Sequence, residues 1–546
     1  CGALTSNAGE ARGEGGAVAS RSALATEVGV DVLRRGGNAV DAAVAVGFAL
    51  AVTHPSAGNL GGGGFMVIRL ANGDIVANDH REKAPAHAHR DMFLDDEGNV
   101  VPGLSTASHL AVGVPGTVDG LLTVLERHGT YSPQAAIEPG LRLAKEGFAL
   151  PADIAAQFVG YRESFARYPA SRTKFTRADG SAYAAGDVFR QPDLAATLQR
   201  IVDRGRAGFY EGPTADLLVA EMARGGGLIS HADLADYRSA WREPVRGTYR
   251  GFDIVSMPPP SSGGALVVQL LNMLEPHDVG SMGHGSAAAT HLMIEAERRA
   301  YADRAEHLGD TDFYDVPMSM LVDKDYARRR LADFDPGAAS RSSDIGAGAW
   351  PEESPETTHV SVMDAAGNAV AYTTTLNLGY GSKIVVTGAG FLLNNEMDDF
   401  SSKPNTPNAF GLIGGDANAI EPGKRMLSSM SPTLVLKDGE PVLVTGSPGG
   451  STIITTVLQV VVNVIDHGMD VAEAVAAPRF HHQWLPNRIR YEPGALLPRT
   501  LATLRSMGHV GLGETRSIGD ANSVMRVGDE LVAASDPRNA GGAGGF

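Results

Sequence analysis

The sequence predicts a mixed α/β protein of the α+β kind, in which a mostly helical part precedes a part rich in hairpins. Apolar residues recur at helical spacing over much of residues 113–330, whereas strand-like alternation prevails after residue 357. Hydrophobic residues make up 43% of the chain and charged residues 20%, as in soluble globular proteins. The 546 residues suffice for two domains or for one large α/β unit with insertions.

The part before residue 357 is expected to begin with a helix, a turn and a hairpin. Apolar spacing marks residues 20–52 as helical, and the glycines at 61–64 lead into a strand at 65–70. Asn72-Gly73 is a typical hairpin turn before a second strand at 75–77. Further helices are expected at 117–127, 133–146, 193–204, 214–223, 289–308 and from Ala265, with a short strand at 252–255.

The part after residue 357 is expected to form hairpins and two helices. The strands are predicted at 359–364, 369–375, 390–394, 433–437 and 441–445, and the helices at 452–467 and from 471. No internal repeat of fixed period is present.

Charge and apolar runs exclude two classes of function. Lys and Arg total 46 against 63 for Asp and Glu, and the net charge of −17 repels nucleic acid. The apolar runs at 42–52 and 453–465 are shorter than the roughly 18 residues that a membrane-spanning helix needs. We therefore expect neither nucleic-acid binding nor a transmembrane helix.

Cys1 is the only cysteine, so no intramolecular disulfide is possible. Mostly small residues follow it, and residues 1–16 are expected to form a flexible tether. Bacterial lipoproteins begin in this way after signal removal, with a lipid on the cysteine. The alternative is a trimmed sequence in which Cys1 has no role. A membrane is expected as a partner only if Cys1 carries a lipid.

Thr357 lies where a loose stretch gives way to the strand-like run that starts with Thr358-His359. If the chain is cut between Glu356 and Thr357, Thr357 becomes an N-terminal residue. It then carries a nucleophilic hydroxyl and its own general base, the α-amine. Thr357 is thus a candidate nucleophile whose activation depends on cleavage.

A glycine-rich turn at 446–451 is predicted between a strand and a helix. Glycines there leave backbone N–H groups open at a helix N-terminus, where an anion is favoured. This arrangement suits an oxyanion hole, although a tight turn that needs positive φ accounts for it equally well.

Motifs for nucleotides and catalytic zinc are absent from the sequence. The glycines at 61–64 lack the dinucleotide-binding spacing and follow a loop instead of a strand. His481-His482 has no carboxylate or cysteine at ligand spacing and is interpreted as structural. No metal and no cofactor are expected.

Polar residues gather in three further segments. Residues 394–400 contain three carboxylates suited to an ammonium group, and residues 425–431 contain hydroxyls suited to a carboxylate. Arg81 adds a guanidinium group after a predicted strand. Each segment alone is most simply an exposed surface, but together they describe a pocket for an amino acid zwitterion.

Over residues 16–538 the chain resembles the γ-glutamyltranspeptidase family. The most specific matches are at 357–359, 373–377, 393–400, 414–418, 424–432 and 445–454. The resemblance implies an N-terminal nucleophile hydrolase with an αββα sandwich, two stacked sheets between helical layers. It also implies self-cleavage of a precursor into a large subunit, 17–356 after the tether, and a small subunit, 357–546, which together form one αββα unit.

The resemblance also implies roles for individual residues. Thr357 would be the nucleophile for cleavage at Glu356–Thr357 and for catalysis, Thr375 would orient it, and Gly449 and Gly450 would form the oxyanion hole. The substrate α-carboxylate would contact Arg81, Ser428 and Ser429, and the α-amine would contact Asn377, Glu396 and Asp399.

The activity implied is transfer of a γ-glutamyl group from glutathione or a related donor, through an ester on Thr357, to water, an amino acid or a dipeptide. Family members act outside the cytoplasm, in the periplasm, in the medium or on the cell envelope. This chain has Glu396 where many bacterial relatives have Gln, and Phe410 in the lid loop at 401–414 where some have Tyr.

Two alternatives remain open at this point. One is a related acylase or a poly-γ-glutamate-processing transpeptidase that uses the same nucleophile. The other is an unprocessed, inactive binding lipoprotein that retains the scaffold.

Overall fold

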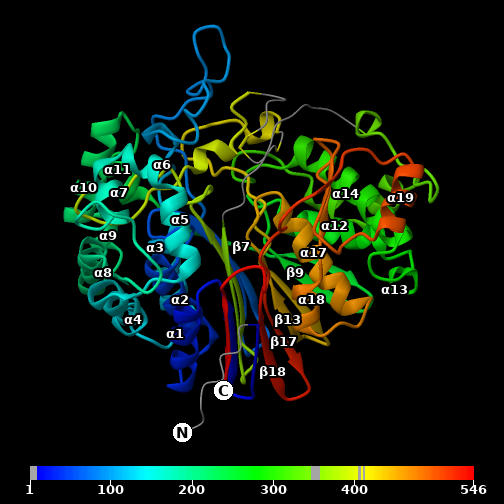
Figure 1. Ribbon diagram of the computed structural model, residues 1–546, viewed down its shortest axis with the longest axis horizontal. Coiled ribbons are helices and arrows are strands. Elements are labelled where there is room, and N and C mark those ends of the chain that lie inside the picture. Colours follow the sequence, from blue (N-terminus) through cyan, green and yellow to red (C-terminus); the bar gives the residue numbers. More distant parts are fainter. Residues whose placement is uncertain (1–8, 346–356, 404–407, 410–411, 413) are drawn as a thin grey trace.

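Two seven-stranded sheets stand face to face between helical layers (Figure 1). The computed structural model describes residues 9–345, 357–403, 408–409, 412 and 414–546. All strand pairs within the two large sheets are antiparallel. The α/β class and the αββα sandwich are confirmed.

The first sheet combines strands from both sides of the expected cut before Thr357. Its order is β19-β2-β10-β11-β3-β4-β7. The bounds are β2 Gly16–Ser20, β3 Gly63–Arg69, β4 Ile75–Asp79, β7 Ala240–Arg242, β10 Thr358–Asp364, β11 Ala369–Thr375 and β19 Gly542–Gly545.

The second sheet is built in the same way, in the order β1-β18-β17-β13-β12-β9-β8. The bounds are β1 Glu10–Gly13, β8 Val245–Tyr249, β9 Phe252–Ser256, β12 Thr433–Lys437, β13 Glu440–Thr445, β17 Asn522–Val527 and β18 Glu530–Ser535. Strands β10 and β11 contact β13 across the interface between the sheets.

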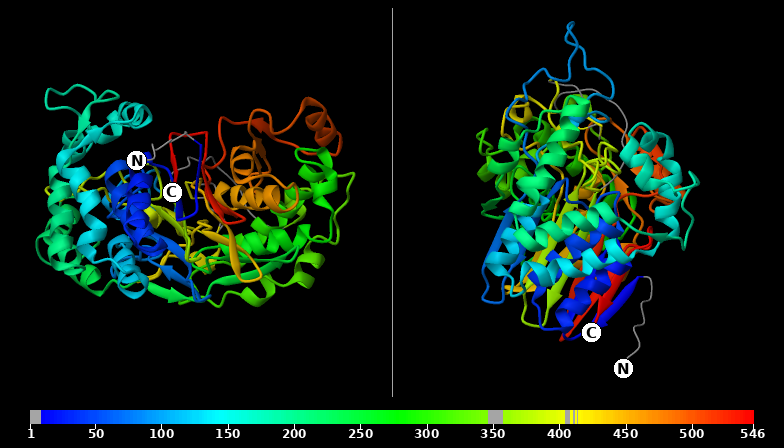
Figure 2. Two further views of the ribbon diagram at one scale, coloured as in Figure 1. Left: turned by 90° about the horizontal axis from the view of Figure 1, so that it is seen from below. Right: turned by 90° about the vertical axis from the view of Figure 1, so that its left-hand side faces the viewer.

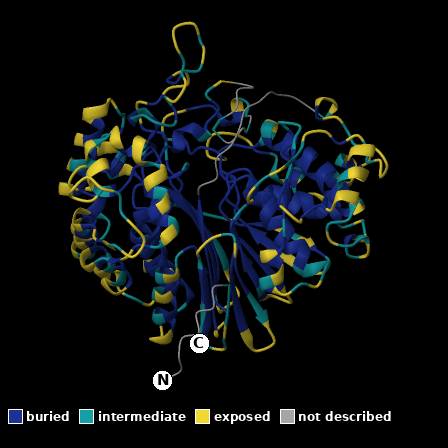
Figure 3. Cartoon of the chain, in the orientation of Figure 1, coloured by how far each residue is buried: buried dark blue, intermediate teal, exposed yellow. Residues whose placement is uncertain are grey.

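Helices cover the outer face of each sheet, as Figure 2 shows from below. On the first sheet lie α1 Ala23–Arg34, α2 Ala39–Thr53, α3 Thr117–His128, α4 Pro133–Glu146 and α8 Pro192–Arg204. On the second lie α12 Gly263–Leu274, α14 Ala287–His307, α17 Thr452–Ile465 and α18 Val471–Ala476. The strands and the inner helices are buried, and exposed residues lie mainly on the outer helices and loops (Figure 3).

Shorter elements complete the described part of the chain. The remaining helices are α5 Ala152–Gly160, α6 Arg162–Ala166, α7 Pro169–Phe175, α9 Ala207–Tyr210, α10 Gly212–Gly225, α11 His231–Asp236, α13 Val279–Met282, α15 Met318–Leu321, α16 Lys324–Arg330 and α19 Pro498–Ser506. The 3-10 turns are η1 His109–Ala111, η2 Ser342–Asp344, η3 Glu396–Asp399 and η4 Asp416–Asn418. The remaining strands are β5 Phe148–Ala149, β6 Val188–Phe189, β14 Phe480–His481, β15 Ile489–Tyr491 and β16 Leu512–Glu514.

Three expectations from the sequence are wrong. Residues 20–52 form two helices, because Asn38 and Asp41 make a capping box that starts α2 anew. Residues 390–394 form no strand and contribute only isolated bridges. The expected tether over 1–16 is too long, since Glu10–Gly13 is strand β1, paired with β18.

No helix in the described part of the chain is long and apolar enough to cross a membrane. The two large hydrophobic clusters lie one on each side of the first sheet. The fold thus places the ends of strands from both sheets around one region, and the polar segments singled out above converge there.

Candidate active site

The hairpin of β10 and β11 places Thr357 beside Thr375. Thr358 pairs with Thr374 in an antiparallel ladder, so Thr357, which precedes Thr358, and Thr375, which follows Thr374, lie at the same end of it. The two hydroxyl oxygens, Oγ1 of Thr357 and Oγ1 of Thr375, are 3.5 Å apart. Thr375 Oγ1 also accepts a hydrogen bond of 2.8 Å from the N–H of Asn377. Strand register alone therefore brings the predicted nucleophile and its predicted partner together.

The turn between β13 and α17 contains Gly449 and Gly450, with φ angles of +137° and +56°. Only glycine adopts such a pair of conformations without strain. The turn precedes the N-terminus of α17, where the helix dipole favours negative charge. Among the described residues, no acceptor is hydrogen-bonded to either N–H group. The two groups are therefore available to an oxyanion.

Arg81 is the centre of a buried cluster of charges. Its guanidinium group lies 2.6 Å from Glu396 and 2.5 Å from Asp399, and the neighbouring Glu82 is 3.6 Å away. Arg81 is 1% exposed, while Glu82 and Glu396 are fully buried. One cation thus faces three carboxyl groups that are largely buried.

Burial changes the acidity of these carboxyl groups. Burial raises the pKa of Glu82 to about 8, although the charge of Arg81 opposes the shift. The pKa of Glu396 and that of Asp399 are also raised by burial, again against Arg81. The cluster therefore retains a proton at neutral pH, since one guanidinium group does not stabilise three carboxylates.

Asn377, Ser428 and Ser429 present further polar atoms to the same space. Asn377 has a φ of +76°, which asparagine tolerates, and its Nδ2 donates to the carbonyl of Asn395. Its Oδ1 is buried without a hydrogen-bond partner among the described residues. Ser428 is fixed by a backbone hydrogen bond of 2.8 Å to Pro260. Asn377 Oδ1 is thus placed for a ligand, because no described residue uses it.

One pocket brings the predicted residues together. Nine of the ten predicted catalytic and substrate-binding residues line it: Arg81, Thr357, Thr375, Asn377, Glu396, Asp399, Ser428, Ser429 and Gly450. Gly449 is adjacent in the turn. The predicted residues Glu356 and Phe410 lie outside the described residues.

The structure also changes the list of candidates. Arg304, Leu412, Met430 and Ile453 line the cavity and were not predicted from the sequence. Helical spacing gave no signal for Arg304, because every residue of α14 from Ala289 to Arg304 is buried and no single buried face stands out. Asp398 does not line the cavity, because its carboxylate accepts hydrogen bonds from Ser105 Oγ and the N–H of Ala409.

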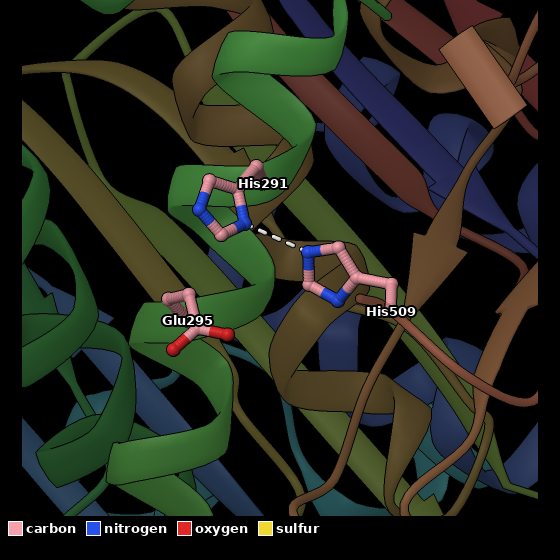
Figure 4. A group of neighbouring side chains, drawn as sticks. All are labelled: His291, Glu295 and His509. Carbon is pink, nitrogen blue, oxygen red and sulfur yellow. Dashed lines mark hydrogen bonds between the residues drawn. The ribbon is translucent and has the colours of Figure 1, made fainter. Parts of the chain in front are cut away.

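His481 and the pair His291 and His509 are hydrogen-bonded within the protein. His481 hydrogen-bonds Thr455 and Gln483, as expected for a structural role. Among the described residues, one group has metal-ligand proximity: His291, Glu295 and His509 (Figure 4). His291 Nδ1 is hydrogen-bonded to His509 Nε2 at 2.7 Å, and Glu295 is paired with Arg299 at 2.7 Å. These ligand atoms are already engaged by the protein, so we assign no metal to them.

The stacked sheets, with a threonine at the start of a central strand and open N–H groups beside it, define an N-terminal nucleophile hydrolase. The chain belongs to the gamma-glutamyltranspeptidase family, whose model matches residues 25–546. Among its relatives, the glutathione hydrolase proenzyme of Escherichia coli K12 is 52% identical over 97% of this chain and 91% of that protein. The glutathione hydrolase proenzyme of Pseudomonas aeruginosa is 46% identical over 99% of this chain and 96% of that protein.

Solved structures agree with this family. A gamma-glutamyltranspeptidase chain from Helicobacter pylori is 48% identical, with a TM-score of 0.58 over 59% of this chain and 92% of that chain. A cephalosporin acylase from Bacillus halodurans has a TM-score of 0.87 over 100% of this chain and 98% of that chain. At 24% identity, the acylase supports the fold alone.

Proposed function

We propose that this protein is a γ-glutamyltransferase and glutathione hydrolase that processes itself by cleavage before Thr357. The observation that carries the proposal is the cavity, in which a cation and carboxylates lie beside Thr357. An amino acid zwitterion carries an ammonium group and a carboxylate on one α-carbon, and these would pair with the carboxylates and the cation of the pocket. Relatives at 46% and 52% identity are named glutathione hydrolase proenzymes, which supports the same substrate.

In the proposed mechanism, Thr357 acts twice. Its hydroxyl first attacks the carbonyl of Glu356, the peptide C–N bond breaks and frees the α-amine, and water then hydrolyses the resulting ester to give fragments 1–356 and 357–546. The freed α-amine then takes the hydroxyl proton as Thr357 attacks the γ-carbonyl of the donor. The N–H groups of Gly449 and Gly450 stabilise the oxyanion, and the amine of the leaving group, cysteinylglycine from glutathione, receives the proton.

The second half of the reaction restores the enzyme. Water, an amino acid or a dipeptide attacks the γ-glutamyl ester, and the α-amine of Thr357 acts as base for this attack. Thr375 keeps the Thr357 hydroxyl in position through the contact between their oxygens. No metal or cofactor enters this scheme.

Substrate binding exchanges one set of ion pairs for another. Before binding, Arg81 is paired with Asp399 and Glu396. The donor α-carboxylate would take Arg81, Ser428 and Ser429, while its α-amine would take Asp399, Glu396 and the free Oδ1 of Asn377. A donor that lacks either charge leaves a buried group unpaired, so γ-linked glutamate is selected.

Release of p-nitroaniline from γ-glutamyl-p-nitroanilide tests the activity directly. Purified protein should release it. It should also show two fragments, the smaller of which starts at Thr357 on N-terminal sequencing. Cleaved protein without release would refute the γ-glutamyl substrate and leave an acylase of the same family, such as the Pseudomonas acylase ACY 1 proenzyme that is 37% identical. Active protein in one piece would refute the role of Thr357.

We also propose that the enzyme works outside the cytoplasm, on glutathione in the periplasm or in the medium. Cys1 is the residue through which a lipid would attach it to the envelope. Labelling of cells with a radioactive fatty acid tests this, and a Cys1→Ser variant should lose the label while retaining activity. Label that persists in the variant would contradict attachment at Cys1.

A further inference from the structure

Arg304, in the last turn of α14, is a second guanidinium group in the cavity and has no role in the scheme above. Arg304 is 4% exposed. It lines the cavity together with Ser428 and Ser429, the residues assigned to the donor α-carboxylate.

Arg304 differs from Arg81 in having no counter-charge in contact. Among the described residues, no carboxylate lies within ion-pair distance of Arg304. Burial lowers the pKa of Arg304 to about 10, and electrostatic interaction with Tyr301 and Asp399 opposes this shift only in part. The group is therefore still charged at neutral pH, and burying an unpaired charge is costly unless an anion compensates it.

The hydrogen bonds of Arg304 lead directly to the serines. Its Nε donates to Ser262 Oγ at 2.9 Å, and its Nη2 donates to Ser429 Oγ at 3.3 Å. Ser262 Oγ in turn donates to the carbonyl of Ser428 at 2.7 Å. Arg304 thus holds both residues of the expected carboxylate subsite, one directly and one through Ser262.

This geometry fixes the direction of the Ser429 hydroxyl. A guanidinium group only donates, so Ser429 Oγ accepts from Arg304 and keeps its own proton for another acceptor. The described residues provide no acceptor for that proton. A carboxylate in the cavity would be such an acceptor, and its charge would compensate Arg304.

We propose that Arg304 positions the donor α-carboxylate. It orients Ser429 as a hydrogen-bond donor, and it adds a positive charge to the one on Arg81, which Glu396 and Asp399 neutralise. This inference rests on the proposed γ-glutamyl function. Arg304 acts through Ser429 and through its charge, and it takes no part in the acyl transfer at Thr357 or in self-cleavage.

The test compares Arg304→Gln and Arg304→Lys with the processed wild-type enzyme on γ-glutamyl-p-nitroanilide. Loss of a hydrogen bond to a charged group corresponds to about 10- to 100-fold, so KM for Arg304→Gln should rise by that factor. The value of kcat should change less than about threefold, since the interaction is the same in the ground and transition states. Arg304→Lys keeps the charge and should recover part of the loss.

Arg299→Lys on the same helix is the matched control, because Arg299 is equally buried but is paired with Glu295 and Asp333. It should leave KM unchanged. An unchanged KM in Arg304→Gln, or a fall in kcat alone, would overturn the inference while the proposed function stands. Unprocessed protein from both Arg304 variants would overturn it too, since the proposed role leaves cleavage intact. An inactive but cleaved wild type would instead refute the proposed function.

Discussion

Helix α14 carries buried arginines that are held in two different ways. In its middle, Arg298 and Arg299 lie 3.4 and 2.7 Å from Glu295, and Arg299 also contacts Asp333 at 2.7 Å. In its last turn, Arg304 has hydroxyl partners alone among the described residues, and it lines the cavity. The same residue type on one helix is therefore part of the structure where it is paired and part of the site where it is not.

The two regions also differ in the number of carboxyl groups for each guanidinium group. In the middle of α14, one carboxylate serves two guanidinium groups and an outer aspartate completes the balance. In the cavity, Arg81 faces three carboxyl groups, and their pKa values are raised by burial. The paired cluster is held together by the protein alone, whereas the cavity leaves charged groups that a zwitterionic ligand would pair one by one, as proposed above.

The largest effect that separates the two regions is expected from Thr357→Ala. The variant lacks the nucleophile, so it should remain one chain and release p-nitroaniline only at background rate. Its thermal stability should stay close to that of other unprocessed protein, because the hydroxyl of Thr357 makes one long contact, with Thr375. Gel electrophoresis and the chromogenic assay measure both outcomes.

Thr358→Val is the control for Thr357→Ala. The Thr358 hydroxyl is buried without a hydrogen-bond partner among the described residues, and valine has the same shape. This variant should be cleaved and active. Turnover by Thr357→Ala, or loss of cleavage in Thr358→Val alone, would show that the nucleophile is misassigned.

The next largest effect belongs to the paired cluster and concerns stability. Glu295→Gln removes the partner of Arg298 and Arg299, and breaking a buried pair costs about 3–5 kcal/mol. The melting temperature should fall clearly, while kcat and KM of the folded enzyme stay unchanged. Glu440→Gln, which breaks an ion pair of a 66% exposed carboxylate with Arg69, should cost at most about 1 kcal/mol. A change in KM for Glu295→Gln would contradict the division between the two regions.

A smaller effect, on kcat, is expected from Gly449→Ala. A Cβ atom at this position would lie 2.3 Å from Thr452 Oγ1, and alanine does not adopt a φ of +137° without strain. The turn must shift, so the N–H groups leave their positions and kcat should fall about 10²- to 10³-fold. Gly439→Ala is the control, since Gly439 also has positive φ, +82°, but its Cβ would meet no atom within 4 Å. Equal kcat values in both variants would exclude the oxyanion hole at Gly449.

The sequence was sufficient for most long elements but not for their arrangement. Helix α4 and strand β11 have the bounds expected from periodicity, because each carries a regular apolar pattern. The break between α1 and α2 was missed, since a capping box at Asn38 outweighs a continuous apolar pattern. The pairing of β1 with β18 joins the two ends of the chain, and no local pattern indicates such a contact.

The site was predicted from local chemistry and from the family resemblance, and the residues that were missed act over long distances. Arg81, Glu396 and Ser429 belong to three separate segments that each look like exposed surface until the fold brings them together. Arg304 was missed because an arginine in a helical stretch is most often exposed. Its role depends on Ser262 and Ser429, both far away in the sequence, and only the folded chain shows this.

The smallest effect concerns Glu82, and its sign decides which carboxyl group shares the charge of Arg81. Burial raises the pKa of Glu82 from 4.5 to about 8, so the folded protein keeps a proton that the unfolded chain loses. Stability from this group is therefore fully present below pH 4.5 and is lost as the pH rises through 8. In Glu82→Gln, the fall in melting temperature between those pH values should be smaller than in wild type, by a few degrees at most. If Arg81 were instead paired with an ionised Glu82, the pKa would be lowered, and the variant would differ from wild type mainly at acidic pH. Arg81 lies 2.6 Å from Glu396 and 3.6 Å from Glu82, so its charge stabilises an ionised Glu396 more than an ionised Glu82. This difference favours the first outcome.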